Sequence, residues 1–577
     1  MKRSILSLLL IASAFAVHAN VSYQKSGPHN VHIRVEGDHR YLLLPIGDNA
    51  HEYRMHIIEN NQLRQTLIVR LADQGKIDYY VPLDLQGLNL SQTHFDVRYG
   101  NEDIAWDQIK VANEFDISNT DYYRPVYHHT PAYGWMNDPN GMFYDEQTGL
   151  WHLYYQHNPY GSKWQNMTWA HSTSSDLVHW EAQPLAIELD IVGAIFSGSC
   201  VVDKHNTAGF GENAVVAFYT SASDNQSQSM AYSLDGGQTF TKYADNPIIT
   251  APIVDFRDPK VWWNEATAEW NMALACGQEM QFYGSKNLKQ WRYLSAFGHG
   301  VGSHDGVWEC PDMLRVKVRG TDTYKWVLLC NINPGGPFGG SATQYFVGEW
   351  DGKTFTPEYD NGEVLTKWMD YGKDHYATVS FAHAPQNRTT VMVWMSNWQY
   401  ANDVPTMQYR SANALPRDID LFKDNEGIYR LGVSMSPELA ALKGKALRTN
   451  TTSYTALPEI AVLEVEVNAS KRPATIVLSN EKGEQVVMTY DFQAGTFSMD
   501  RTASRLKDFS RDFAATTTTP LFGKAKKQRV TIFIDKCSIE AFDAKGNWAM
   551  TNLVFPTAPY TQVKVVGGKA NVYSINY

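Results

Sequence analysis

Short runs of β-branched and aromatic residues, bounded by Gly, Asn and Asp, recur through most of the chain. Runs of this length are typical of β-strands, whereas amphipathic helices need longer stretches with a period of about 3.6 residues. In the N-terminal part, such runs stand at 31–35, 53–57, 65–69 and 95–98. They predict a small antiparallel β-sandwich over residues 20–122. We interpret this domain as an accessory module, because its sequence contains no catalytic constellation.

From residue 123 to about 431 the apolar runs repeat at a longer spacing. Five of them stand at 152–156, 215–219, 270–274, 326–329 and 391–395. Each of the first four precedes a turn that ends in an aromatic residue. The turns contain Asp176, Asp235, Asn287 and Asp351, which are 59, 52 and 64 residues apart. Repeats of this length, each several strands long, predict β-propeller blades, and five copies predict five blades.

A third region follows the repeats. Ser436 as N-cap and Pro437 at the first helical position predict a short helix within a linker at 432–446. Alternating apolar runs at 463–467, 474–478 and 530–534 predict a β-sandwich over 447–577. The expected fold is therefore all-β: a five-bladed propeller at 123–431, a C-terminal β-sandwich, and a sandwich-like N-terminal domain.

Residues 1–19 have the features of an export signal. Lys2 and Arg3 form a basic head, residues 8–17 are mostly apolar, and residues 17–19 form a cleavage site. The apolar run is too short to cross a bilayer. We expect a protein without a membrane span that is exported, to the periplasm if the host is Gram-negative and otherwise into the medium.

Composition narrows the choice of partners. Charged residues are interspersed, the formal net charge is −11 and no basic run is present, so nucleic acid is not an expected partner. Aromatic residues make up 13% of the chain, which favours carbohydrate-stacking surfaces besides a large core. The sequence carries no signal for an oligomeric state.

Metal and cofactor signals are weak. The five cysteines are scattered without metal-ligand spacing, and we expect them to be buried and structural. The pair His128-His129 has no third ligand at a convincing distance, so neither a metal nor a cofactor is expected. The Gly-rich stretch at 334–340 lacks a lysine and a following helix, and is interpreted as a loop at the rim of the propeller.

The most informative stretch is Trp-Met-Asn-Asp-Pro-Asn-Gly at 135–141. Pro139 fixes its own φ and pushes Asp138 towards an extended conformation, while Asn140-Gly141 tolerates positive φ. We expect a sharp, rigid bend that holds the Asp138 carboxylate among aromatic residues. A buried turn without chemistry is the alternative for this stretch alone.

Two further acids occupy similar places in other blades. Asp258 stands just before the third apolar run and Glu309 just before the fourth. A glycosidase needs a nucleophilic carboxylate and a proton donor with a raised pKa. A third carboxylate can bind sugar hydroxyls as positive charge develops on the ring. The alternative is that Asp258 only pairs with Arg257 or caps a turn, and that Glu309 is an ordinary surface acid.

The motif at 135–141, Arg257-Asp258-Pro259 and Glu309-Cys310 resemble the three signature motifs of glycoside hydrolase family 32, the β-fructosidases. The resemblance extends over roughly 124–577. It implies that Asp138 is the nucleophile, Glu309 the general acid/base and Asp258 the transition-state stabiliser. It also implies a five-bladed propeller followed by a β-sandwich, in agreement with the repeat count.

The resemblance further implies a set of residues that hold the terminal fructose: Asn137, Gln156, Trp164, Asn166, Phe196, Ser197, Arg257, Asp374 and Tyr376. Trp164, Trp308 and Trp398 are candidates for narrowing the channel into a pocket, which favours attack from the chain end. His375 stands where an aromatic residue is commoner in the family, and Ala170 where glycine is usual.

We therefore expect a retaining hydrolase that removes terminal β-D-fructofuranosyl residues from fructans (inulin or levan), with sucrose as a further candidate substrate. Alternatives within the family are an endo-acting levanase or inulinase and a fructosyltransferase. The alternative of another class is a non-catalytic carbohydrate-binding propeller. The three intact acids favour the enzyme, and the residues do not indicate the linkage preference.

Overall fold

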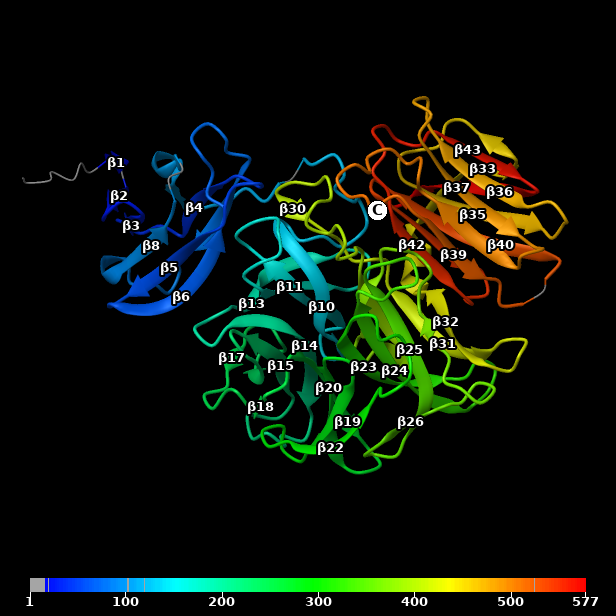
Figure 1. Cartoon of the computed structure of the whole chain (residues 1–577), viewed down its shortest axis with the longest axis horizontal. Coiled ribbons are helices and arrows are strands. Elements are labelled where there is room, and N and C mark those ends of the chain that lie inside the picture. The colour runs from blue at the N-terminus through cyan, green and yellow to red at the C-terminus, as the bar shows by residue number, and fades with distance from the viewer. Residues whose placement is uncertain (1–15, 19, 101–102, 119, 524) are drawn as a thin grey trace, which may run out of the picture. The chain divides into compact units, whose positions relative to one another are not determined.

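The computed structural model describes residues 16–18, 20–100, 103–118, 120–523 and 525–577 (Figure 1). Most of the predicted export signal thus lies outside the described residues. The chain forms two compact units. The N-terminal unit comprises residues up to Ser118 together with Asn158–Asn166 and Leu189–Ile191, and the large unit comprises the remainder. No helix among the described residues is long and apolar enough to cross a membrane.

The N-terminal unit contains two antiparallel sheets, which confirms the predicted β domain. The six-stranded sheet has the order β1-β2-β3-β8-β5-β6, with β1 (Ala16–His18), β2 (Val21–Lys25), β3 (Asn30–Val35), β5 (Tyr53–Glu59), β6 (Gln62–Val69) and β8 (Thr93–Arg98). The three-stranded sheet has the order β7-β4-β9, with β4 (Tyr41–Ile46), β7 (Tyr79–Asp84) and β9 (Lys110–Ala112). Short 3₁₀ helices, η1 (Leu90–Gln92) and η2 (Trp106–Gln108), precede β8 and β9. Buried and more exposed positions alternate along β5, as period-two patterning requires.

The large unit begins with five sheets, each the blade of a propeller (Figure 1). Blade 1 comprises β10 (Gly134–Asp145), β11 (Leu150–Asn158), β12 (Thr168–Ser174), β13 (Glu181–Ile187) and the short parallel strand β30 (Tyr409–Arg410). Blade 2 comprises β14 (Ala194–Asp203), β15 (Ala214–Ala222), β16 (Gln226–Ser233), β17 (Thr241–Lys242) and β18 (Ile249–Thr250).

Blade 3 comprises β19 (Phe256–Asn264), β20 (Glu269–Cys276), β21 (Met280–Ser285) and β22 (Arg292–Phe297). Blade 4 comprises β23 (Val307–Lys317), β24 (Tyr324–Asn333), β25 (Ala342–Trp350), β26 (Phe355–Pro357) and β27 (Lys367–Trp368). Blade 5 comprises β28 (Tyr376–Ser380), β29 (Thr390–Trp394), β31 (Arg417–Lys423) and β32 (Tyr429–Met435), with the 3₁₀ turn η3 (Pro385–Asn387) before β29.

The innermost strands close a ring. They contact one another in the order β10-β14-β19-β23-β28, and β28 contacts β10. This confirms the predicted five blades. The apolar runs that revealed the repeat are the second strands β11, β15, β20, β24 and β29, which lie inside their sheets and are buried almost throughout.

The repeated turns owe their sequence to one hydrogen-bonding pattern. In each, a side-chain oxygen accepts backbone N–H groups a few residues further along the chain. Asp176 accepts from His179 at 2.8 Å, Asp235 from Thr239 at 3.0 Å, Asn287 from Gln290 at 3.0 Å and Asp351 from Thr354 at 2.7 Å. Such Asx turns replace the hydrogen bonds that the backbone loses between the third and fourth strands of a blade.

Four innermost strands carry a β-bulge at the same level. The register shifts by one extra residue between Ile195 and Gly198, Arg257 and Lys260, Glu309 and Asp312, and Tyr376 and Val379. In three of these bulges one residue has positive φ: Asp258 at 65°, Cys310 at 41° and Ala377 at 56°. A bulge bends its strand and redirects side chains, and positive φ at non-glycine residues is a strained conformation that clusters at functional sites.

The bend predicted at 138–141 is wrong, because this stretch lies within β10. Pro139 is tolerated there since β30 pairs only with Gly134 and Trp135, which leaves the inner edge of β10 without a partner strand at residue 139. Gly141 alone has the expected positive φ, 51°. A Cβ atom at Gly141 would lie 2.8 Å from the Cys200 sulfur, so close packing also requires glycine.

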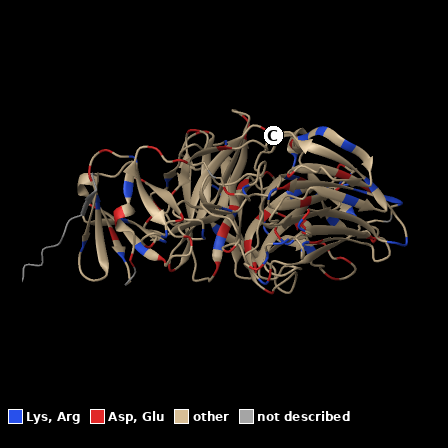
Figure 2. Ribbon diagram, turned by 90° about the horizontal axis from the view of Figure 1, so that it is seen from above, with Lys and Arg blue, Asp and Glu red and all other residues tan. Residues whose placement is uncertain are grey.

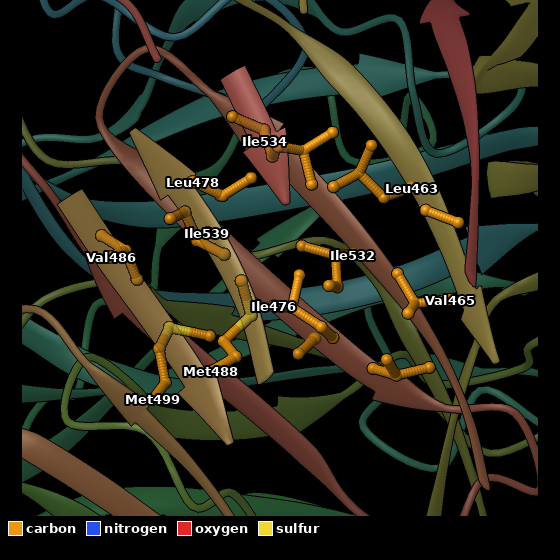
Figure 3. Close-up of a cluster of buried hydrophobic side chains, with 14 of the residues drawn as sticks. Leu463, Val465, Ile476, Leu478, Val486, Met488, Met499, Ile532, Ile534 and Ile539 are labelled. Carbon is orange, nitrogen blue, oxygen red and sulfur yellow. The ribbon is translucent and has the colours of Figure 1, made fainter. Parts of the chain in front are cut away.

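The chain ends in a β-sandwich of two six-stranded sheets, as predicted. One sheet has the order β33-β44-β35-β40-β41-β42, with β33 (Lys443–Thr451), β35 (Ala461–Asn468), β40 (Lys527–Asp535), β41 (Ser538–Asp543), β42 (Ala549–Leu553) and β44 (Gly568–Ile575). The other has the order β34-β43-β36-β37-β38-β39, with β34 (Ser453–Tyr454), β36 (Ala474–Ser479), β37 (Gln485–Asp491), β38 (Thr496–Asp500), β39 (Thr516–Pro520) and β43 (Gln562–Val566). Figure 3 shows the apolar core between them, to which Leu463, Ile476, Met488 and Ile532 contribute.

The helix predicted near 436 is a 3₁₀ helix, η4 (Pro437–Leu442), rather than an α-helix. The Ser436 side chain does not cap it; the hydroxyl donates to Asp418 at 2.9 Å instead. Strands β32 and β33 directly flank η4, so the connection between propeller and sandwich is shorter than the predicted linker.

The distribution of charged side chains and the burial of the cysteines agree with the sequence analysis. Figure 2 shows acidic and basic residues interspersed over strands and loops. All five cysteines are free thiols, and all are buried as predicted.

Several histidines of the large unit are buried in the neutral form. Burial lowers the pKa of His129, His157 and His375 to about 4. Neither ring nitrogen of His375 has a hydrogen-bond partner. His128 is the opposite case, because Asp535 and Glu540 accept hydrogen bonds from its two nitrogens at 2.7 and 2.8 Å. These carboxylates outweigh the burial of His128 and raise its pKa to about 9.

We predict that His375→Phe stabilises the protein in mild acid. The pKa of His375 falls from 6.5 to about 4 on folding, so between these values the unfolded chain binds a proton that the folded chain does not. Stability is therefore lost as the pH falls through this window, and phenylalanine removes both this loss and two unpartnered nitrogens. Thermal unfolding midpoints at pH 5 and 7 test this, with a larger gain expected at pH 5.

His128→Phe is the matched control. It leaves two buried carboxylates without their partner, and we expect a loss of several kcal/mol, in the range of about 3–5 kcal/mol for a broken buried pair. A lower midpoint for His375→Phe at pH 5 would contradict the interpretation of His375.

Candidate active site

Three carboxyl groups converge at one end of the innermost strands. Asp138 lies on β10, Asp258 on β19 and Glu309 on β23. Cys310, the residue after Glu309, links the other two: its thiol donates to Asp138 Oδ2 at 3.3 Å, and its N–H donates to Asp258 Oδ2 at 2.8 Å. Residues from blades 1, 3 and 4 thus form one site, as the shared position of the acids predicted.

Arg257 supplies the positive charge of this site. Its Nη2 and Nε donate to Glu309 Oε1 at 2.9 and 3.2 Å, and Nε lies 4.0 Å from Asp258 Oδ2. A further bond from Nη1 to Asp255, at 2.6 Å, fixes the guanidinium from the other side. The alternative that Asp258 pairs with Arg257 and does nothing else does not describe this arrangement, because Arg257 is shared between two acids.

The surroundings raise the pKa of two of the three carboxyl groups above its ordinary value in water. Burial, together with the charges of Glu309 and Asp138, raises the pKa of Asp258 to about 7, although Arg257 opposes the shift. Burial and the charge of Asp138 also raise the pKa of Glu309, against Arg257 and the hydroxyl of Tyr376. The Glu309 side chain is 20% exposed, so a proton on it can reach a bound molecule.

Asp138 is held in one orientation by several donors. Ser197 donates to its Oδ2 at 2.7 Å, and the Asn137 amide donates to its Oδ1 at 3.0 Å. Asn137 is itself fixed by the indole N–H of Trp135 at 2.7 Å. Asp138 remains partly exposed. A fixed, hydrogen-bonded and accessible carboxylate is what a covalent nucleophile requires.

Tyr376 completes the surroundings of Glu309. This tyrosine begins β28, is 1% exposed, and its hydroxyl donates to Glu309 Oε2. The same strand lines the axis of the propeller together with the other four innermost strands. Residues of these strands line a small pocket beside Asp258, and Lys260, one of its lining residues, donates to Asp312 at 3.0 Å and to Ser380 at 3.1 Å.

Other predicted residues of the large unit lie close to this site. Gln156 is buried and donates to the Ile195 carbonyl at 2.9 Å, two residues before Ser197. Phe196 is partly exposed between them. Trp398 is partly exposed and stacks on Trp135, with ring centroids 5.8 Å apart.

Trp308 does not narrow the channel, contrary to expectation. It is 0% exposed, and its indole N–H donates to the Ser303 carbonyl at 2.8 Å, so it contributes to packing.

Asp374 is hydrogen-bonded to protein groups other than the three acids. Asp374 is 0% exposed, and both of its oxygens are bonded to protein groups. Tyr400 donates to Oδ1 at 2.5 Å, while Arg501 and the N–H of Leu553 donate to Oδ2. Glu540 is likewise buried and accepts from Arg417 at 2.7 Å.

Two predicted residues, Trp164 and Asn166, belong to the N-terminal unit. The Asn166 side chain binds the backbone of Ile68 in both directions: its Oδ1 accepts from the N–H at 2.8 Å, and its Nδ2 donates to the carbonyl at 2.8 Å. Its amide is therefore engaged by protein groups rather than by the three acids. A contact between Trp164 and substrate stays a prediction.

Cys310 is the functional contact that sequence reasoning missed. We grouped it with the buried structural thiols, yet it touches both Asp138 and Asp258. Its place directly after Glu309 was the available signal.

One group with metal-ligating side chains stands out among the described residues. His32, His94 and Asp96, all partly buried in the N-terminal unit, bring their ligand atoms within 4.8 Å of one another. These side-chain types suit zinc. A direct hydrogen bond between His32 Nδ1 and Asp96 accounts for part of this closeness, and the exposed Arg98 follows Asp96 by two residues on β8.

Comparisons with known proteins agree with this geometry. The model for the N-terminal domain of glycosyl hydrolases family 32 matches residues 128–431, and the model for the C-terminal domain of the same family matches residues 436–577. Residues 27–127 match a domain of unknown function, DUF4980.

Curated relatives cover most of the chain. A levanase from Bacillus subtilis is 42% identical over 473 residues, which are 78% of this chain and 69% of the levanase. An extracellular exo-inulinase from Aspergillus niger is 35% identical over 506 residues, which are 79% of this chain and 93% of the inulinase.

Solved structures show the same fold. The exo-inulinase from Aspergillus awamori superposes with a TM-score of 0.75 at 33% identity, over 80% of this chain and 99% of that chain. A β-fructofuranosidase from Schwanniomyces occidentalis, solved in complex with fructosyl-erythritol, superposes with a TM-score of 0.73 at 32% identity, over 79% of this chain and 98% of that chain.

We predict that Asp258→Asn stabilises the folded protein at neutral and alkaline pH. The pKa of Asp258 rises from 3.8 to about 7 on folding, so its contribution to stability is lost as the pH rises through this window. Asparagine does not ionise and keeps an acceptor for the N–H of Cys310. The gain should reach about 2–4 kcal/mol at pH 8 and narrow towards pH 4, measured by denaturant titration.

Asp312→Asn, on the neighbouring innermost strand β23, is the control. It removes the buried partner of Lys260 and should lower stability at pH 8. If Asp258→Asn also lowers stability at pH 8, this result would contradict the claim that ionisation of the Asp258 carboxyl destabilises the folded state.

Proposed function

Since the chain belongs to glycoside hydrolase family 32, it is a glycoside hydrolase of the β-fructofuranosidase type, and we propose that it removes terminal fructosyl units from fructans. The observation that carries the proposal is the convergence of Asp138, Asp258 and Glu309 around Arg257. Relatives named levanase, exo-inulinase and invertase support a fructan or sucrose substrate.

In the first step, the Asp138 carboxylate attacks the anomeric carbon of the terminal fructose. The bond to the glycosidic oxygen breaks, and this oxygen takes a proton from Glu309. The donors on both Asp138 oxygens keep the carboxylate aimed, and the raised pKa of Glu309 suits a proton donor. The product is a fructosyl ester on Asp138 and a free leaving group.

In the second step, Glu309 takes a proton from water, whose oxygen attacks the anomeric carbon and releases Asp138. The two displacements retain the configuration at the anomeric carbon. Asp258 is proposed to bind sugar hydroxyls while positive charge develops on the ring, and Arg257 balances the charge of the site.

The residues proposed to contact the terminal fructose are Asn137, Gln156, Phe196, Ser197, Arg257, Tyr376 and Trp398. Asp374 leaves this set because it is 0% exposed and both of its oxygens accept from protein groups other than the three acids. Asn166 leaves it because both polar atoms of its amide bind the backbone of Ile68. Trp398, fixed against Trp135, presents a rigid aromatic face of the kind that stacks on sugar rings.

We further propose that the protein acts outside the cytoplasm, because its first residues have the features of an export signal and the inulinase relatives are named extracellular. Fractionation of the native host tests this. Activity in the periplasm or the medium is expected, and activity confined to the cytoplasm would contradict it.

Asp138→Asn and Glu309→Gln should each lower turnover of fructan by several orders of magnitude while leaving the fold intact. Removal of the nucleophile blocks the first displacement, and removal of the acid leaves the departing oxygen without a proton. Steady-state rates on inulin, with circular dichroism as the folding control, test both variants.

Glu309→Gln should regain part of its rate on an activated fructoside whose leaving group needs no proton, and Asp138→Asn should not. Near-wild-type turnover of inulin by either variant would overturn the assigned roles.

Exo action is proposed from the partly exposed Trp398 beside the acids and from the exo-inulinase relatives. Incubation with sucrose, inulin and levan, followed by chromatography of the first products, tests it. We expect fructose as the only early product from the polymers. A ladder of oligosaccharides before any fructose would indicate an endo-acting enzyme, and longer chains would indicate a fructosyltransferase.

A further inference from the structure

The segment 370–376, which leads from blade 4 into β28, is hydrogen-bonded along strand β42 of the C-terminal sandwich. Tyr371 N–H donates to the Ala549 carbonyl at 3.0 Å, and Asp374 N–H donates to the Thr551 carbonyl at 3.2 Å. Between these bonds, a Cβ atom at Gly372 would lie 1.9 Å from the Thr551 carbonyl oxygen. The segment thus lies against β42 as closely as a paired strand, and only glycine fits at 372.

Buried side chains fix the segment at both ends. Arg417 donates to Asp370 at 2.6 Å, with both side chains at most 1% exposed. Arg501, which follows β38 of the sandwich, pairs with Asp374, also with both side chains at most 1% exposed.

Arg501 is itself firmly held. Its guanidinium donates to the Leu553 carbonyl at 2.9 Å and the Phe513 carbonyl at 2.8 Å, and lies 3.9 Å from the Phe513 ring centroid. Tyr400 joins the pair: it donates to Asp374 at 2.5 Å and accepts from Arg501 at 2.8 Å. The backbone at 374 therefore has little freedom to move.

This anchored backbone continues directly into the site. Tyr376 follows Asp374 by two residues, and its hydroxyl donates to Glu309. The next residue, Ala377, has a φ of 56° and forms the bulge of β28, so the direction of the Tyr376 side chain depends on how the preceding backbone is held.

We propose that the C-terminal sandwich positions the acid/base Glu309 through Tyr376, with Asp374 and Arg501 as the positioning pair. The proposal rests on the proposed function of Glu309 and assigns the sandwich a part in the reaction. Neither Asp374 nor Arg501 reaches the substrate in it.

Glu309 responds to several neighbours, and Tyr376 is one among them. The charged and titratable groups that face Glu309 are Asp138 on β10, Arg257 and Asp258 on β19, Cys310 on β23, Cys330 on β24 and Tyr376 on β28. The Tyr376 hydroxyl stabilises the ionised form of Glu309 and so lowers its pKa. Loss of this hydrogen bond should move the alkaline limb of the pH profile to higher pH.

The test compares Tyr376→Phe with the double variant Asp374→Leu/Arg501→Met. The double variant replaces the buried pair by apolar side chains of similar size, because loss of one partner leaves an uncompensated buried charge. The readout is kcat/KM between pH 4 and 9 on inulin and on an activated fructoside. We expect a decrease of about tenfold on inulin for the double variant, a smaller decrease on the activated fructoside, and an alkaline limb shifted as in Tyr376→Phe.

The triple variant gives the sharpest result. If Asp374 and Arg501 act through Tyr376, adding their substitutions to Tyr376→Phe should change the pH profile little further. Equal losses on both substrates with an unchanged pH profile, or fully additive losses in the triple variant, would overturn the proposal. Should Glu309→Gln retain full activity on inulin, the proposed function fails instead, which separates the two claims.

Two more variants keep the test decisive if the double variant does not fold. Tyr400→Phe removes one hydrogen bond from each member of the pair and leaves the ion pair, so a smaller shift in the same direction is expected. Arg319→Met is the control: Arg319 binds Asp420 at 2.8 Å and the Gly546 carbonyl of the sandwich at 3.1 Å, and neither partner belongs to β28. It should lower the unfolding midpoint without moving the pH profile. An unshifted profile in Tyr400→Phe would contradict the proposal.

Discussion

The mutual repulsion of three carboxyl groups is the constraint on which the rest of the site depends. Asp138, Asp258 and Glu309 approach one another in a largely buried place, where charges are poorly screened. The guanidinium of Arg257 lies near both Glu309 and Asp258, and its positive charge offsets part of the repulsion. Burial, together with the remaining repulsion from Asp138, raises the pKa of Glu309, so Glu309 keeps its proton to higher pH than an exposed glutamate would.

The propeller supplies the geometry that this cluster needs. Five innermost strands meet around one axis, and bulges at one level of four of them redirect side chains there. The strained φ values of Asp258 and Cys310 belong to these bulges. The sandwich has a complementary part, because it holds the backbone that leads to Tyr376. The residues that shape the innermost strands, such as Asp258 and Cys310, are therefore also residues of the site.

Sequence reasoning predicted those strands that are buried on both faces of their sheet. The second strands of the blades were found because they are mostly apolar, and the repeat spacing reflects the Asx turns of Asp176, Asp235, Asn287 and Asp351. The innermost strand β10 was read as a bend, because Asp138, Pro139 and Asn140 carry turn propensity. Its place at the inner edge of a sheet overrides that propensity.

Sequence reasoning located neighbouring side chains where motifs mark equivalent positions of the blades, and failed where the partner lies outside the repeat. The three acids and Ser197 lie together as their motifs indicated. Asp374 was misjudged because its partner Arg501 belongs to the C-terminal sandwich, and Asn166 because its partner Ile68 belongs to the N-terminal unit. No local pattern reveals such partners.

The central claim is that Asp138 forms a covalent bond to fructose. Rapid quenching of Glu309→Gln with an activated fructoside, followed by peptic digestion and mass spectrometry, tests it most directly. The account predicts a peptide heavier by one fructosyl unit, with the modification on Asp138. A modification on another residue, or turnover without any labelled peptide and with inverted configuration in the product, would contradict it.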